Sequence, residues 1–229
     1  MKRFVILTGA GISAESGIST FRDHDGLWQT HRMEDLATPE AWKRNPELVL
    51  EFYNQRRKQL FEVNPNAGHL ALVKLEEKFD VQIITQNVDD LHERAGSSNV
   101  LHLHGELRKA SSTIDPNLVY DIGNKPIKLG DLCEKGSQLR PYVVWFGEPV
   151  PKIHEAVTLA SKADIFIVIG TSLLVYPASG LIHYVAIEVP KYYVDPKAFG
   201  VHGVRNLNVI KQKAGTGVPE LVKELLQNV

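Results

Sequence analysis

Short apolar runs recur along the chain and predict the strands of a buried sheet. They consist mainly of β-branched, aliphatic and aromatic residues, and four are clear: Phe4–Leu7, Val81–Ile84, Ile165–Ile169 and Tyr192–Val194. Such runs are typical of parallel strands that are covered on both faces. Helical patterns lie between or after them, at His69–Lys78, His154–Ser161 and Pro219–Leu226. Strands that alternate with helices predict an α/β fold with a doubly wound, Rossmann-like parallel sheet.

Two segments interrupt this alternation. Residues 24–66 have an amphipathic helical pattern, in which Pro39 and Pro46 mark helix starts. Residues 106–140 are rich in proline and glycine, so they predict a loop-rich insertion. We therefore expect a single domain over residues 1–229. Its large part would comprise about 1–23, 67–105 and 141–229, and the two insertions would form a small module.

Composition narrows the class of protein further. A chain of 229 residues with 43% hydrophobic residues and a formal charge of −1 is typical of a globular domain. There is no basic surplus to favour nucleic acid, and the longest apolar runs are too short to cross a membrane. The first strand begins near residue 4, which leaves no room for a signal peptide. A single cysteine excludes an internal disulfide and fits the cytoplasm, where we expect a monomer.

A glycine-rich turn follows the first apolar run directly. The segment Gly9-Ala10-Gly11-Ile12-Ser13-Ala14 fits the pattern G-x-G-x-x-G/A. Small residues there let the backbone approach a pyrophosphate at a helix N-terminus, although similar turns also occur where nothing binds. A dehydrogenase would carry an acidic residue about 20 positions further on, at the end of a second strand. Asp23 and Asp25 lie near that distance without a strand before them, which disfavours hydride transfer.

Four further motifs carry polar groups that suit chemistry: Thr85-Gln86-Asn87-Val88-Asp89, His102-Leu103-His104-Gly105-Glu106, Val143-Val144-Trp145-Phe146-Gly147-Glu148 and Gly170-Thr171-Ser172-Leu173. The first and last follow predicted strands, so they emerge at the carboxyl edge where parallel sheets bind ligands. Asp89 could instead cap a helix. The segment from Val143 to Glu148 predicts an exposed edge strand, with a core strand as the alternative.

The two histidines of the second motif are candidates for acid–base chemistry. His102 and His104 are two residues apart on a predicted strand, so both would face the same side. A metal pair would need a third ligand, which is not evident nearby, and a satisfied core histidine is the other alternative. An unperturbed histidine pKa near 6.5 makes a neutral imidazole available at physiological pH, as a general base requires.

Together with the segment from Gly9 to Arg22, these motifs resemble the sirtuins, the NAD-dependent protein lysine deacylases, over nearly the whole chain. The resemblance implies NAD as cofactor and acylated-lysine proteins or peptides as substrates. It implies that His104 is the general base, which leaves His102 a structural role. It implies that Val144 and Phe146 pair with the substrate backbone. Chance agreement of this many motifs in the same order is very improbable.

The resemblance also implies which residues contact NAD. Gln86, Asn87 and Asp89 would line the nicotinamide end. Asp195 stands where sirtuins usually carry an asparagine against the adenosine ribose, and Gly215 would pass beside the adenine. The complete expected set is Gly9, Ala10, Gly11, Ser13, Phe21, Arg22, Gln86, Asn87, Asp89, Gly170, Thr171, Ser172, Asp195 and Gly215.

Sirtuins usually hold a structural zinc with two C-x2-C pairs in the second insertion, and the chain departs from that pattern. The matching frame is Ser112-x2-Asp115, then seventeen residues, then Cys133-x2-Gly136. A structural zinc site takes four ligands, and three of the four thiolates are absent. We therefore expect no zinc and a module that is held by loop packing.

The first insertion resembles the sirtuins that remove acidic acyl groups. In that subgroup a tyrosine and an arginine bind the distal carboxylate of succinyl-lysine, and a small residue leaves space for it. Tyr53, Arg56 and Ala37 match these positions. Tyr53 and Arg56 are spaced i, i+3 and would share a helix face, although a surface arginine is more often only solvated. A guanidinium can bind a carboxylate bidentately, whereas an acetyl group offers it nothing.

The resemblance implies a reaction in which the acyl oxygen displaces nicotinamide from NAD. His104 would then take a proton from a ribose hydroxyl, and O-acyl-ADP-ribose and free lysine would result. Two alternatives remain open at this point. A sirtuin-like transferase could pass ADP-ribose to a protein, and a non-catalytic chain could bind NAD as a sensor.

Overall fold

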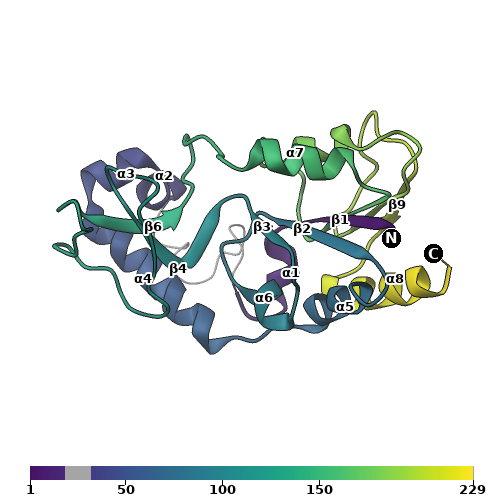
Figure 1. Ribbon diagram of the computed structural model, residues 1–229, viewed down its shortest axis with the longest axis horizontal. Coiled ribbons are helices and arrows are strands. Elements are labelled where there is room, and N and C mark those ends of the chain that lie inside the picture. The colour runs from purple at the N-terminus through teal and green to yellow at the C-terminus, as the bar shows by residue number, and fades with distance from the viewer. Residues whose placement is uncertain (19–31, 229) are drawn as a thin grey trace.

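The computed structural model describes residues 1–18 and 32–228. In this part of the chain, six strands form one parallel sheet in the order β3-β2-β1-β7-β8-β9 (Figure 1). The strands are β1 (Arg3–Thr8), β2 (Asp80–Thr85), β3 (Val100–His102), β7 (Ile165–Ile169), β8 (Lys191–Val194) and β9 (Leu207–Ile210). The sheet confirms the α/β prediction and the four predicted strands. It adds β9 and places the strand that was predicted around His102 at Val100–His102 (β3), and both are short edge strands.

Alternate residues of the central strands point to two separate cores. Phe4 and Ile6 face α5 (Ala67–Leu75) and α8 (Ala214–Asn228), whose apolar side chains include Leu72 and Leu221. Val5 and Leu7 face the opposite side, where they share a core with α7 (Ile153–Ser161) and the 3-10 helix η2 (Ala178–Tyr184). Figure 1 shows α7 on one side of the sheet and α5 with α8 on the other. Because both faces are covered, the central strands β1 and β7 are mainly apolar.

The helix α8 begins at Ala214, earlier than the predicted start at Pro219. Because proline usually lies in the first turn of a helix, the pattern predicted a start at Pro219. The earlier turn is held by a contact that is distant in sequence, because the Gly215 N–H donates to the Glu15 carboxylate at 2.6 Å. Such a contact has no local signature.

The order of the strands reverses at β1. From β1 the chain adds β2 and β3 on one side, and it later returns to add β7, β8 and β9 on the other. The register pairs Thr8 with both Thr85 and Ile169, so β1, β2 and β7 end at the same level. This is the switch point at which open α/β sheets bind ligands.

The small module packs beside this edge of the sheet. It contains three short antiparallel strands, in the order β5-β4-β6, and three described helices. The elements are α2 (Met33–Leu36), α3 (Pro39–Arg44), α4 (Pro46–Glu62), β4 (Gly105–Ser112), β5 (Val119–Asp121) and β6 (Leu139–Val143). Pro39 and Pro46 begin helices as predicted, and the side chains of Thr38 and Asn45 cap them. A shared apolar core joins α4 to β4 and β6.

Residues 106–140 are mainly loops, and they also contain most of β4, all of β5 and the start of β6. Two other sequence expectations in this region are wrong. The segment from Val144 to Glu148 is a turn rather than an edge strand, because β6 ends at Val143. His102 and His104 do not share a strand, since β3 ends at His102 and β4 begins at Gly105. Gly105 has φ of +83°, which breaks the extended backbone there.

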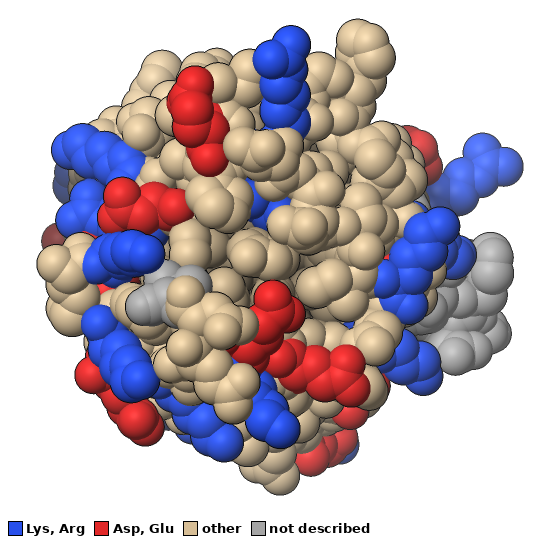
Figure 2. Space-filling view, turned by 90° about the vertical axis from the view of Figure 1, so that its right-hand side faces the viewer, with Lys and Arg blue, Asp and Glu red and all other residues tan. Residues whose placement is uncertain are grey.

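Among residues 1–18 and 32–228, no helix combines the length and the apolar character that a bilayer crossing requires. Figure 2 shows the end of the molecule where β9 lies. Basic and acidic side chains are interspersed on that face, in agreement with a net charge close to zero.

Two buried histidines lie behind the sheet edge, on helices α5 and α6 (Leu91–Ala95). The rings of His69 and His92 are 4.9 Å apart in an edge-to-face arrangement. Burial lowers the pKa of His69 to about 4 and holds the pKa of His92 well below its ordinary value. Both rings are therefore neutral at physiological pH. The Nδ1 atom of His69 accepts a hydrogen bond from the Asn66 N–H at the start of α5.

Because these rings are neutral in the folded protein, we expect the protein to lose stability as the pH falls below about 6.5. An unfolded histidine takes up a proton below about pH 6.5, whereas the folded His69 resists protonation down to about pH 4. His69→Gln keeps an acceptor for the Asn66 N–H and removes this titration. Between pH 6.5 and 4 the loss of unfolding free energy should therefore be smaller in the variant, by up to about 1.4 kcal/mol per pH unit. Denaturant unfolding at several pH values measures it. Equal slopes in both proteins would contradict this explanation, and His154→Gln on the exposed side of α7 is the control.

Candidate active site

The loops after β1 and β7 are joined by their backbones. The Gly9 N–H donates to the Ile169 carbonyl at 3.0 Å, and the Gly11 N–H donates to the Gly170 carbonyl at 2.7 Å. A Cβ atom on Gly11 would lie 2.7 Å from the Gly170 Cα, and Gly170 itself has φ of +60°. The glycines are therefore required first for the contact between the two loops. Ala10 and Ser13, which lie in the glycine turn, line a cavity.

Three predicted side chains form a chain of hydrogen bonds below this contact. The Asn87 amide donates to the Gly9 carbonyl and to the Ser13 hydroxyl, each at 3.1 Å. The Ser13 hydroxyl donates to the Asp89 carboxylate at 2.9 Å. The other carboxylate oxygen of Asp89 accepts from the Leu91 N–H at 3.2 Å. Asp89 thus also accepts a hydrogen bond from the first residue of helix α6, as the alternative interpretation, a helix cap, suggested.

Both oxygens of Asp89 accept hydrogen bonds in this arrangement, which favours the ionised form. The residue is only 5% exposed. Burial raises the pKa of Asp89, and the hydrogen bonds from Ser13 and Leu91 oppose that rise. The site therefore holds a buried carboxylate that depends on its donors to stay charged.

His104 has a defined tautomer. Its Nδ1 atom lies 2.9 Å from the Gln86 carbonyl, which can only accept, so Nδ1 carries the hydrogen. The Nε2 atom then has its lone pair available as a base. Burial lowers the pKa of His104, although the bond to Gln86 opposes this. The ring is thus neutral at physiological pH. The Gln86 side chain donates to the Thr171 hydroxyl at 3.2 Å and links this loop to β7.

The predicted acyl-binding residues lie on the wall formed by the small module. Tyr53 is 7% exposed, and burial raises its pKa to about 12, against the opposing charge of Arg56. Ala37 is buried and its carbonyl accepts from the Phe146 N–H at 2.9 Å. Arg56 lines a cavity together with Ala10, Ser13, Gln86, Asn87 and Asp89. The structure thus brings Arg56, the arginine predicted to bind an acidic acyl group, and the glycine-turn residues to one space.

The sequence pattern did not indicate several other residues of this cavity. Ile18, Gln59, Leu60, Val88 and Leu107 complete its lining. Gln59 follows Arg56 at i+3 on α4, and this spacing is the sequence pattern that could have placed Gln59 beside Arg56. A separate open groove of about 530 Å³ lies between α4 and residues 124–129, and no predicted site residue lines it.

The remaining predicted residues lie around the same edge of the sheet or outside the description. Ser172 follows Thr171, and Asp195 follows β8, where its carboxylate accepts from the Lys197 N–H at 2.7 Å. Gly215 lies in the first turn of α8 beside Glu15. Val144 is partly buried and Phe146 is 42% exposed in the turn after β6. Phe21 and Arg22 lie outside the described residues.

Three of the four positions of the degenerate metal frame have side chains that bind other protein groups. The Cys133 thiol donates to the Ser112 hydroxyl at 3.3 Å. The Lys135 ammonium lies 2.7 Å from the Asp115 carboxylate, and Gly136 has no side chain. Among residues 1–18 and 32–228, no group of three or more histidine, cysteine, aspartate and glutamate side chains is placed to hold a metal ion.

The parallel sheet, its switch point and the polar loops around it define a protein of the Rossmann-like, dinucleotide-binding class. The model of the Sir2 family matches residues 9–177. A protein of Bacteroides thetaiotaomicron, named NAD-dependent protein deacylase, is 56% identical over 99% of this chain and 98% of its own length. One of Helicobacter pylori with the same name is 55% identical over 99% of both. The chain therefore belongs to the Sir2 family.

Solved structures agree with this assignment. A Sir2 homologue in complex with NAD is 42% identical and has a TM-score of 0.89, over 99% of this chain and 90% of that one. A Sir2 protein in complex with a p53 peptide and NAD⁺ is 29% identical and has a TM-score of 0.78, over 98% of this chain and 94% of that one.

The partners of the metal frame predict that the small module is independent of zinc. The protein should contain much less than one zinc per chain after dialysis, as measured by mass spectrometry of the metal. Its melting temperature should be the same with and without a strong chelator, because no ligand set for the ion is present at this frame. One zinc per chain that survives dialysis, or a chelator-induced loss of stability, would show that this prediction is wrong.

Proposed function

We propose that this Sir2-family chain, an NAD-dependent protein deacylase like its relatives, removes acetyl and also succinyl or malonyl groups from lysine side chains of proteins. The products would be free lysine, nicotinamide and O-acyl-ADP-ribose. One observation carries the proposal: Arg56 shares a cavity with residues of the glycine turn and with Gln86, Asn87 and Asp89. The residues suited to NAD and the residue suited to an acidic acyl group thus lie side by side.

The residues present at the sheet edge fit NAD. Gly9–Ser13 and Gly170–Ser172 form the interlocked loops where the phosphates would lie. The carboxylate of Asp195 would accept from a ribose hydroxyl, with Gly215 beside the adenine. Gln86, Asn87 and Asp89 supply amide and carboxylate groups for the nicotinamide end. When bound, NAD supplies the ribose that receives the acyl group, with nicotinamide as the leaving group.

His104 would act as the general base. The Gln86 carbonyl fixes the Nδ1 hydrogen, so Nε2 can take a proton from a ribose hydroxyl. Burial keeps the ring neutral near pH 7. A base that is already deprotonated at the working pH is efficient in proton transfer.

The substrate chain would lie along the turn after β6. The backbone N–H groups of Val144, Trp145 and Phe146 already donate within the protein, to His104, Glu148 and Ala37 respectively. A peptide beside this turn would therefore be bound through acceptors and side chains, rather than by the regular pairing of an edge strand. Val144 and Phe146 would contact the lysine stem and its neighbours.

We predict that replacement of His104, the proposed base, causes a loss of turnover. His104→Ala should lower deacylation by about 10²–10⁴-fold while the far-ultraviolet circular dichroism stays unchanged. In the wild-type protein, kcat/KM should fall only on the acid side of pH 6.5, since the pKa of His104 is lowered. A mass-spectrometric peptide assay measures both. His154→Ala on the exposed face of α7 is the control, and retained turnover in His104→Ala would exclude this base.

The acyl preference is tested at Arg56. Arg56→Met should reduce desuccinylation by about 10–100-fold, because charge-assisted hydrogen bonds contribute about 1.5–3 kcal/mol each. Deacetylation should change little, because an acetyl group makes no such bond. Rates with acetyl-, malonyl- and succinyl-lysine peptides measure the difference.

Lys58→Met is the matched control, since it removes an exposed positive charge from the same helix. Equal losses with all three peptides would show that Arg56 has no role in acyl selection.

A further inference from the structure

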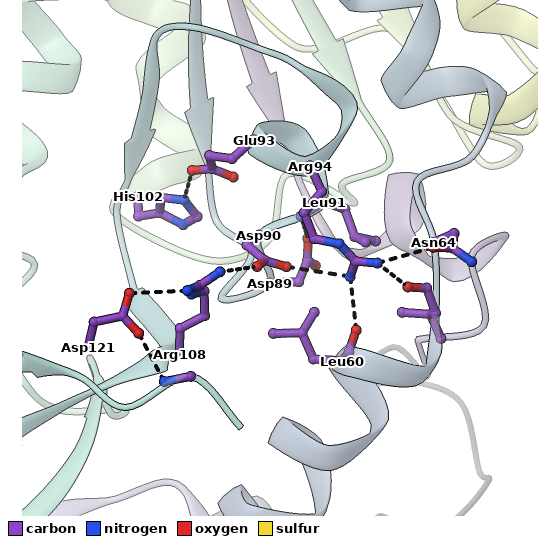
Figure 3. A network of polar contacts seen from close by, with 12 residues as sticks. Leu60, Asn64, Asp89, Asp90, Leu91, Glu93, Arg94, His102, Arg108 and Asp121 are labelled. Carbon is purple, nitrogen blue, oxygen red and sulfur yellow. Dashed lines mark hydrogen bonds and ion pairs between the residues drawn. The ribbon is translucent and has the colours of Figure 1, made fainter. Parts of the chain in front are cut away.

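The ring of His102 lies between two acceptors. Its Nε2 atom is 2.6 Å from a carboxylate oxygen of Glu93, and its Nδ1 atom is 3.1 Å from the Asn87 carbonyl (Figure 3). Neither partner has a hydrogen to donate when the carboxylate is ionised. Both ring nitrogens must therefore carry hydrogens, and His102 is an imidazolium. It is only 5% exposed, so this is a buried positive charge.

The surroundings of His102 support the charged form. Burial lowers the pKa of His102 and the Glu93 carboxylate raises it, and the net direction is upward. Glu106 on β4 and Asp89 in the preceding loop add negative charge, while His92 on α6 is neutral. Lys109 pairs with Glu106, and Arg94 and Arg108 pair with Asp90, so these positive charges are already compensated. His102 thus differs from the buried neutral rings of His69 and His92.

The two histidines of the motif bind neighbouring peptide groups of one loop. His104 donates to the Gln86 carbonyl and His102 donates to the next carbonyl, that of Asn87. The same loop carries the Asn87 side chain and the Asp89 carboxylate. Burial destabilises the anion of Asp89. The positive charge of His102, together with the hydrogen bonds from Ser13 and Leu91, stabilises it.

We propose that His102 is a positioning residue: as a cation that Glu93 holds in place, it fixes the Gln86–Asp89 loop and keeps the Asp89 carboxylate ionised for the nicotinamide end of NAD. This inference rests on the proposed function. The other flank of the loop is independently fixed, because Asp90 pairs with Arg94 and with Arg108, which also binds Asp121 (Figure 3). A change at Glu93 should therefore act locally.

Glu93→Gln is the decisive variant. The glutamine can accept or donate at the same place, so the hydrogen bond can persist while the counter-charge is removed. The side chain of Glu93 is 40% exposed, and the variant should fold. Glu77→Gln, at an exposed site after α5, makes the same chemical change elsewhere and is the control. His102→Asn keeps a donor at the δ position and loses the charge.

The first measurement is the protonation of the histidine rings by nitrogen NMR on the full chain. In the wild-type protein at pH 7.5, both nitrogens of His102 should be protonated, whereas His69 and His92 should be neutral. In Glu93→Gln, His102 should be neutral at the same pH. The signals are assigned from their absence in the substituted proteins. A neutral His102 in the wild-type protein would overturn the proposal, and this readout does not depend on any enzymatic activity.

The second measurement is steady-state kinetics. In Glu93→Gln and His102→Asn the KM for NAD should rise by about tenfold, and inhibition by nicotinamide should weaken, while the KM for the peptide stays the same. The wild-type KM for NAD should rise at alkaline pH, as His102 loses its proton, and Glu93→Gln should lack this rise.

An unchanged KM for NAD in Glu93→Gln would refute the positioning role. If no acyl group is removed at all but His102 is cationic and Glu93→Gln weakens NAD binding by calorimetry, then the proposed function fails and this inference holds.

Discussion

The close contact between the loops after β1 and β7 is the constraint on which the site depends. Two backbone hydrogen bonds join Gly9 and Gly11 to residues 169 and 170, at a separation that excludes any Cβ atom. The contact fixes where helix α1 (Ala10–Ala14) begins, and so where Ser13 lies. Ser13 in turn links Asn87 to Asp89. The end of β2 is therefore tied to the switch point through one buried hydroxyl.

Around this contact, the kind of hydrogen-bond partner decides each protonation state. One ring nitrogen of His104 has an acceptor, so the ring can remain neutral and keep a free lone pair. Both nitrogens of His102 have acceptors, so that ring is a cation. Asp89 accepts from two donors, which favour its anion against the effect of burial. Three residues within one small region thus differ in charge because their partners differ, which intrinsic pKa values could not indicate.

Much of the large part could be predicted from the sequence, because strands buried on both faces have a strong apolar signal. Polar motifs that follow such strands must meet at one edge, and so the convergence of Ser13, Asn87 and Thr171 was predictable. The short strand β9 was not, since four partly or fully exposed residues give little pattern. The turn at residues 144–148 and the break at Gly105 depend on packing against the small module. The contact of Cys133 with Ser112 joins residues far apart in the chain, so no local pattern predicts it.

Asp90 explains how the two parts of the molecule are coupled. Arg94, which pairs with Asp90, also donates to the Leu60 and Val63 carbonyls at the end of α4. Arg108 connects the same carboxylate to β4 and, through Asp121, to β5. The helix that carries Tyr53 and Arg56 is thus anchored beside Asp89. A shift of α4 would therefore move Arg94 and disturb its ion pair with Asp90, so the positions of Tyr53 and Arg56 are coupled to the loop after β2.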